Sequence, residues 1–82
     1  MSAALVRGST LLAEWRTKRE MSQTEFALRL RELGVTGHNS SVCHYEAGSR
    51  LPRLRVAVAI ERVTDGAVPC ASWVDLDQAE AA

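Results

Sequence analysis

Apolar residues recur every three or four positions along most of this chain, and no stretch shows the alternation with a period of two that is typical of a half-exposed strand. The sequence therefore predicts short helices joined by short connections. In the first helix, predicted over residues 10–20, Leu12 and Trp15 share one face. Ser9 or Thr10 precedes that face, and either side chain is suited to cap a helix N-terminus.

A second helix begins at residues 22–25, which read "SQTE". A serine followed three residues later by a glutamate forms a capping box, which satisfies two free N–H groups at the start of a helix. The apolar face of this helix comprises Phe26, Ala27, Leu30 and Leu33. Gly34 ends the helix, because glycine readily adopts the left-handed conformation that follows many helices.

Glycine and proline mark the bounds of two further helices. The third is predicted over residues 39–47 and ends at Gly48. Its N-cap is His38 or Asn39. Pro52 opens the fourth helix, since proline is tolerated only at a helix start. The repeating positions of that helix are Leu54, Ala57, Val58 and Glu61, and Gly66 follows its end.

A short fifth helical turn, from Pro69 toward Trp73, completes a predicted domain that spans residues 1–74. The predicted fold class is all-α, a compact domain of four or five helices. Its predicted core comprises Leu12, Trp15, Phe26, Ala27, Leu30, Leu33, Val42, Tyr45, Leu54, Val58 and Ile60. Residues 75–82 have little to bury and are predicted to form an acidic, flexible tail.

The charges of this chain are unevenly distributed, although its 82 residues have a net charge of zero. Residues 1–62 contain all ten basic side chains and six acidic ones, a balance of +4. Residues 63–82 contain four acidic side chains and no basic one, a balance of −4. A basic body with an acidic end differs from a uniformly neutral protein and is compatible with a nucleic-acid partner.

Several classes of protein are not expected from this sequence. No run of 18 apolar residues occurs and the first residues lack the apolar segment of a signal peptide, so we expect a cytoplasmic protein with reduced thiols and no membrane contact. No CxxC or HxxxH spacing supports a metal site, and a Cys43–Cys70 disulfide is not expected. No nucleophile–base–acid set or glycine-rich phosphate loop is present, so we expect no enzyme, no cofactor and no small-molecule ligand.

Three segments together resemble a known family. The stretches "WRTKREMSQTEFALRL", "SSVCHYEAGSRLP" and "VAIERVTDG" are similar to the helix-turn-helix (XRE-type) domain of phage lambda-type repressors and Cro, over residues 9–66. The matching marks occur in the same order and are Arg16, Ser22, Gln23, Phe26, Ala27, Val42, Tyr45, Glu46, Gly48 and Pro52. Each mark is weak alone, but their combination in one order is fairly specific.

The resemblance implies a lambda-repressor-like fold, in which the second helix crosses the DNA backbone and the third lies in the major groove. It also implies a buried ion pair between Arg16 and Glu46. The base-reading positions that it implies are Asn39, Ser40 and His44. The DNA-backbone contacts expected beside them are Gln23, Ser41, Arg50 and Arg53.

The segment between the second and third helices departs from the family pattern. From Ala27 to Gly48 the chain has about five residues more than the usual spacing, and the extra length lies in "RLRELGVTGHN". The family's tight turn must therefore be replaced by a longer second helix, a longer loop, or both. The angle between the two helices and the residue that caps the third helix depend on which of these occurs.

The third helix has an unusually sparse outer face. Its members span an arc of ~140° at about 100° per residue and are Asn39, Ser40, Cys43, His44 and Ala47. Short donors and acceptors suit a helix that enters the major groove, because base edges must come close to it. This adds Cys43 to the predicted base-reading residues. A merely solvated helix face is the alternative interpretation.

The predicted function is therefore sequence-specific binding of double-stranded DNA by a small, bacterial or phage-encoded, Cro-like repressor. One such domain reads only a few base pairs, so we expect a homodimer on an inverted-repeat operator. Apolar residues outside the main helices are expected to form the dimer contact: Val68, Cys70 and Trp73. The alternative function is a protein-binding adaptor or an antitoxin of the same fold, with Trp73 either as its anchor or as a lid on the core.

Overall fold

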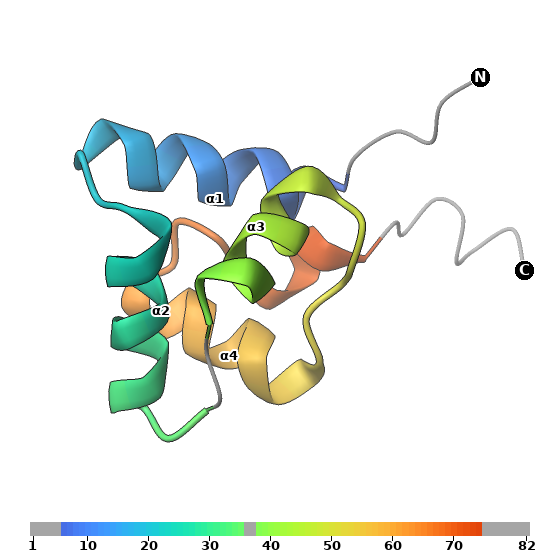
Figure 1. Ribbon diagram of the computed structural model, residues 1–82. Helices are drawn as coiled ribbons and strands as arrows, with labels where there is room; N and C mark the ends of the chain where they lie inside the picture. Colours follow the sequence, from blue (N-terminus) through green and yellow to red (C-terminus); the bar gives the residue numbers. More distant parts are fainter. Residues whose placement is uncertain (1–5, 36–37, 75–82) are drawn as a thin grey trace, which may run out of the picture.

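Four α-helices and one short 3-10 turn make up the regular structure of residues 6–35 and 38–74, the part of the chain that the computed structural model describes. The elements are α1 (Arg7–Lys18), α2 (Gln23–Glu32), α3 (Asn39–Ala47), α4 (Leu54–Val63) and the 3-10 turn η1 (Cys70–Trp73) (Figure 1). No strand occurs in these two ranges, so the all-helical prediction is confirmed for them. The predicted acidic tail at residues 75–82 lies outside the described residues.

Local signals in the sequence define several of the helix ends. The hydroxyl of Ser22 accepts a hydrogen bond from the backbone N–H of Glu25 at 3.0 Å, which confirms the predicted cap of α2. Gly34 follows α2 with φ +86°, and Gly48 ends α3 with φ +77°. Both lie in the left-handed region, which glycine adopts without steric cost. The N-cap of α3 is His38, which makes no side-chain cap hydrogen bond.

The start of α1 differs from the prediction. The helix begins at Arg7, and its N-cap is Val6 rather than Ser9 or Thr10. Ser9 lies inside the first turn and is completely buried. Burial of this first turn against the rest of the protein, rather than a local capping side chain, therefore sets where α1 begins.

All five elements contribute to one hydrophobic core, and Figure 1 shows α3 lying across the other helices. The buried apolar residues are Leu12, Phe26, Ala27, Leu30, Val42, Tyr45, Ala57, Ala59, Ile60, Val68 and Trp73. Trp15 is half-buried and packs edge-on against Phe26, with ring centroids 5.8 Å apart. Seven of the predicted core residues are buried, and six of these lie on the predicted core faces of α1, α2 and α3.

The predicted core face of α4 is wrong at two of its positions. Leu54 is 75% exposed and Val58 is 38% exposed, whereas Ala57 and Ile60 point inward. Leu33, predicted in the core from α2, is also exposed. These three exposed side chains line an open groove between the end of α2 and α4. The buried side of α4 is the apolar side opposite Arg55 and Arg62, whereas the prediction followed Leu54 and Val58, which lie on the same side as the two arginines.

The segment around η1 closes the core over α1. Val68 is 0% and Trp73 is 4% exposed. A Cβ atom on Gly8 would lie 2.5 Å from the Trp73 indole. Tyr45 packs edge-on against the same indole, with ring centroids 6.3 Å apart. Val68 and Trp73 therefore do not provide the exposed apolar surface that we predicted for a dimer, because the chain's own core already covers them. Trp73 is a lid on the core and not an exposed anchor.

Glu61 connects α4 to η1. Its carboxylate accepts a hydrogen bond from the backbone N–H of Cys70 at 2.8 Å. This bond, more than any other contact, lowers the pKa of Glu61 below its ordinary value. Burial, together with the neighbouring Glu61 carboxylate, raises the pKa of the Cys70 thiol. The ionised form of Glu61 thus contributes to the attachment of η1.

This contact predicts a pH-dependent loss of stability on replacing Glu61. A depressed folded-state pKa contributes stability above the ordinary carboxyl range, and that contribution disappears as pH falls through the folded-state value. Glu61→Gln should therefore melt below the parent at pH 7, and the difference should shrink as the pH is lowered to about 3. Thermal melts of the parent, Glu61→Gln and the exposed control Glu14→Gln test this. A Glu61→Gln deficit of equal size at every pH would contradict it.

Candidate nucleic-acid interface

The outer face of α3 is uncovered. Figure 1 shows α3 at the front of the view, with no other labelled helix across it. All five side chains of this face are exposed, and they are Asn39, Ser40, Cys43, His44 and Ala47. None of them is a long charged side chain, so other groups can approach the helix closely. The opposite face is anchored by Val42 and Tyr45, which are 0% and 7% exposed.

An ion pair between α1 and α3 holds the C-terminal half of α3 in place. Arg16 donates from Nε to one carboxylate oxygen of Glu46 at 2.6 Å and from Nη2 to the other at 2.9 Å. Its Nη1 donates to the carbonyl of Met21 at 2.8 Å. Only 16% of the Arg16 side chain and 9% of the Glu46 side chain are exposed. The ion pair that the family resemblance implied is thus present, in the two-pronged geometry that best matches a guanidinium to a carboxylate.

The same network includes the start of α2. Gln23 donates from its side-chain amide to Glu46 at 3.2 Å. The hydrogen bond that Arg16 donates to Glu46 also raises the pKa of Arg16 above its ordinary value, more than the charge attraction does. Gln23, Arg16 and Glu46 therefore connect α2, α1 and α3. One amide N–H of Gln23 is used in this way, and the group has a second N–H with which to contact a phosphate.

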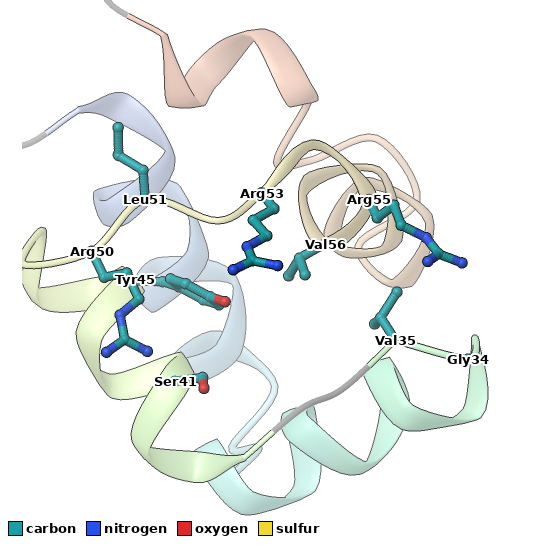
Figure 2. Close-up of a pocket in the computed structure, with 9 residues that line it drawn as sticks. All are labelled: Gly34, Val35, Ser41, Tyr45, Arg50, Leu51, Arg53, Arg55 and Val56. Carbon is teal, nitrogen blue, oxygen red and sulfur yellow. The ribbon is translucent and has the colours of Figure 1, made fainter.

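A basic cavity lies beside α3. It has a volume of about 650 Å³, is open to solvent and lies between α3, the α3–α4 connection and the start of α4. Figure 2 shows Arg53 directed into this space and Arg55 pointing away from it. The lining residues are Gly34, Val35, Ser41, Tyr45, Arg50, Leu51, Arg53, Arg55 and Val56. With Arg55 directed away, Arg50 and Arg53 are the arginines that give the cavity positive charge, and no lining residue is acidic, so the cavity favours an anion.

The helix termini near this cavity add to its positive potential. Neither α3 nor α4 has a side-chain cap or an acidic residue in its first turn. Their first backbone N–H groups therefore lack a side-chain partner, and the helix dipole places partial positive charge there. An anion between the two helices would meet these groups as well as the side chains of Arg50 and Arg53.

The structure places the predicted contact residues in two adjoining regions. The predicted base-reading residues lie on the outer face of α3, and Ser41, Arg50 and Arg53 line the cavity beside it. Gln23 lies apart from the cavity, at the start of α2. The extra chain between α2 and α3 is accommodated by a connection at residues 33–38, of which 36–37 are outside the described residues.

Two contacts were not predicted from the sequence. Ser49 approaches His44, whose Nδ1 lies 2.9 Å from the Ser49 hydroxyl. Arg55 lines the cavity, although scattered arginines were not distinguishable from ordinary surface charge in the sequence. A serine directly after the glycine that ends a helix is the one local signal for the first contact, because such a glycine turns the chain back toward the last helical turn.

The two cysteines are free thiols, with Cys43 exposed on α3 and Cys70 half-buried in η1. Across residues 6–35 and 38–74, no three His, Cys, Asp or Glu side chains come together in a way that could hold a metal ion. In the same ranges, no helix combines the length and the apolar character needed to cross a membrane. Compared with known protein families, with curated proteins and with solved structures, the chain has no significant match.

Proposed function

We propose that this chain binds double-stranded DNA in a sequence-specific manner, with α2 and α3 acting as a helix-turn-helix of the lambda-repressor type. The observation that carries the proposal is the combination of a sparse, exposed face on α3 with a cavity directly beside it that is lined by Arg50 and Arg53 and by no acidic residue. A groove-binding helix needs short side chains toward the bases and cations toward the adjoining phosphates.

In this proposal the outer face of α3 enters the major groove. Asn39 and Ser40 form the first turn of the helix, and Cys43 and His44 lie one turn later on the same side. The amide of Asn39 can pair with an adenine edge through two hydrogen bonds. The ion pair at Glu46 and the buried Val42 hold the helix rigid, so that little order has to be gained on binding.

The sugar–phosphate backbone is contacted on both sides of that helix. Arg50 and Arg53, with the hydroxyl of Ser41, would hold a phosphate in the basic cavity. Gln23 would contact the backbone from the start of α2. Such contacts set the position of a protein on the duplex but carry no direct sequence information. One domain of this size contacts only a few base pairs, so a homodimer that acts as a Cro-like repressor on an inverted repeat would give the greatest sequence specificity.

Selection of bound duplexes from a random pool tests this function directly. We expect enrichment of a short inverted repeat, whose affinity falls steeply with salt concentration. A pool with no enriched sequence and no salt-dependent binding would contradict the proposal. It would favour a protein-binding adaptor instead, for which the exposed groove at Leu33, Leu54 and Val58 is the apolar surface available.

Variants of the outer face of α3 and variants of the basic cavity should lose DNA binding in different ways. Asn39→Ala should lose about 1–3 kcal/mol of binding on the selected duplex and little on an unrelated one. Arg50→Ala should weaken both duplexes by the same factor and reduce the salt slope by about one. Arg62→Ala, on α4 but outside the cavity, is the matched control. Anisotropy titrations over a salt series measure all three, and an Asn39→Ala variant with unchanged discrimination would contradict the assignment of α3.

A further inference from the structure

His44 is the one base-facing side chain with a hydrogen-bond partner among the described residues. Its Nδ1 lies 2.9 Å from the hydroxyl oxygen of Ser49. The left-handed Gly48 between α3 and Ser49 turns the chain back, so that the backbone N–H of Ser49 donates to the carbonyl of His44 at 3.1 Å. The position of the Ser49 hydroxyl is thus set by the end of α3 itself.

The direction of this hydrogen bond decides what His44 presents to DNA. The Ser49 hydroxyl has one proton and two groups within reach, which are His44 Nδ1 at 2.9 Å and the His44 carbonyl at 3.4 Å. The carbonyl already accepts the N–H of Ser49, and 3.4 Å is long for a hydroxyl donor. A Ser49 proton directed to Nδ1 makes the shorter of the two contacts, and this geometry favours Nδ1 as the acceptor.

We infer that Ser49 is a positioning residue that holds the neutral His44 ring with its proton on Nε2, so that α3 offers guanine a single donor. The tautomer of a histidine is set by the hydrogen bond that its other ring nitrogen makes. With Nδ1 occupied by Ser49, the exposed ring edge carries a donor and no free acceptor. The choice of guanine rests on the proposed DNA-binding function, whereas the tautomer does not.

The pattern of groups in the major groove selects guanine among the four bases. Guanine displays two neighbouring acceptors, N7 and O6, toward which one donor can be directed without meeting another donor. Adenine places its amino group beside N7, thymine places a methyl group beside O4, and cytosine displays a donor only. A histidine held as a donor therefore favours guanine, whereas one held as an acceptor would favour the amino groups of adenine or cytosine.

The tautomer is measurable on the free protein, without DNA. Long-range proton–nitrogen correlation spectra at about pH 8, where imidazoles are ordinarily neutral, distinguish the protonated from the unprotonated ring nitrogen. We expect Nε2 protonated and Nδ1 unprotonated in the parent and in Ser49→Thr, and a mixture in Ser49→Ala. A proton on Nδ1 in the parent, or identical spectra for the parent and Ser49→Ala, would overturn the role of Ser49.

The base preference is measured on the duplex that selection yields. Replacing the guanine opposite His44 by 7-deazaguanine, which lacks the N7 acceptor, should weaken binding of the parent about tenfold and that of His44→Ala hardly at all. Ser49→Ala should lose about two- to fivefold on the selected duplex, because a smaller fraction of its His44 is in the competent form, and nothing on unrelated DNA. Ser49→Thr should restore the parent affinity.

The outcomes of these experiments distinguish the proposed role of Ser49 from the proposed DNA-binding function. Sensitivity to 7-deazaadenine instead of 7-deazaguanine would overturn the preference for guanine. An Nε2-protonated His44 in a protein that selects no duplex would refute DNA binding but leave the role of Ser49 in setting the tautomer intact.

Discussion

Trp73→Ala should lower the free energy of unfolding by about 3–5 kcal/mol, which is the usual cost of truncating a buried aromatic side chain to alanine. Trp73 is 4% exposed, and its ring fills the space between Gly8 of α1 and Tyr45 of α3. Its removal opens a cavity at the joint between α1, α3 and η1. Because a domain of this size has a stability of only about 5–15 kcal/mol, this variant should approach the limit of folding, which urea denaturation measures.

Two further variants separate packing from other effects of this tryptophan. The indole Nε1 is buried without a hydrogen-bond partner in the described part of the chain. Trp73→Phe removes that unpaired group while keeping an aromatic ring, so it should cost much less than Trp73→Ala. Gly8→Ala should also destabilise the protein, since its Cβ would lie 2.5 Å from the indole.

The combined variant gives the sharper test of this contact. In Gly8→Ala/Trp73→Ala the new methyl group no longer meets the indole, so the double variant should be more stable than the sum of the two single losses. Strict additivity would contradict the packing described here. A Trp73→Ala variant that keeps the stability of the parent would instead show that Trp73 is available to a partner, as we first predicted from the sequence.

Arg16→Met should cost about 2–4 kcal/mol of stability, slightly less than breaking a fully buried ion pair. The substitution removes the guanidinium that donates to Glu46 and to the carbonyl of Met21. The Glu46 carboxylate, with 9% of its side chain exposed, would then keep only its hydrogen bond from Gln23. An almost buried charge without its partner is strongly unfavourable, and this makes the effect large.

The chain contains a matched control for this ion pair. Arg29 and Glu32 form a pair on α2 at 3.9 Å, with side chains that are 51% and 69% exposed. Arg29→Met should change the stability by under about 0.5 kcal/mol, because solvent screens an exposed pair. Replacing both partners, as in Arg16→Met/Glu46→Leu, should recover most of the loss. Equal melting temperatures for the parent and Arg16→Met would mean that the network does not hold α3.

The ion pair also connects stability with the proposed function. Arg16 reaches α3 through Glu46, and Gln23 at the start of α2 shares the same carboxylate. Loss of this network would loosen α3 against both neighbouring helices. At temperatures where Arg16→Met remains folded, we therefore expect weaker binding to a selected duplex, with the order of preference among sequences unchanged.

A large part of the candidate site was predictable, because its residues are marked by type and spacing. The sparse face of α3 follows from the positions of Asn39, Ser40, Cys43 and His44 at helical intervals. The partners Arg16 and Glu46 followed from the resemblance alone, because they are 30 positions apart and no local pattern connects them. The approach of Ser49 to His44 and the contribution of Arg55 to the cavity were not predictable, since both depend on how α3 and α4 are placed.

The sequence by itself determined the all-helical class of the described residues and several helix ends. The Ser22 cap and the glycines at 34 and 48 act on the backbone beside them, so these signals can be recognised from the sequence alone. The inward faces of α1, α2 and α3 could also be predicted from their apolar positions, except for Leu33 at the end of α2, which is exposed.

The buried side of α4 was also marked in the sequence, as the apolar side opposite Arg55 and Arg62, although we predicted the side with Leu54 and Val58. Only the tertiary structure decided what covers Trp73. Trp73 is exposed or buried according to whether Gly8 leaves room for its ring, and residues so far apart meet only once the chain has folded. Periodicity marks the apolar face of each helix, whereas steric fit between residues far apart in the sequence decides whether a side chain such as Trp73 is buried.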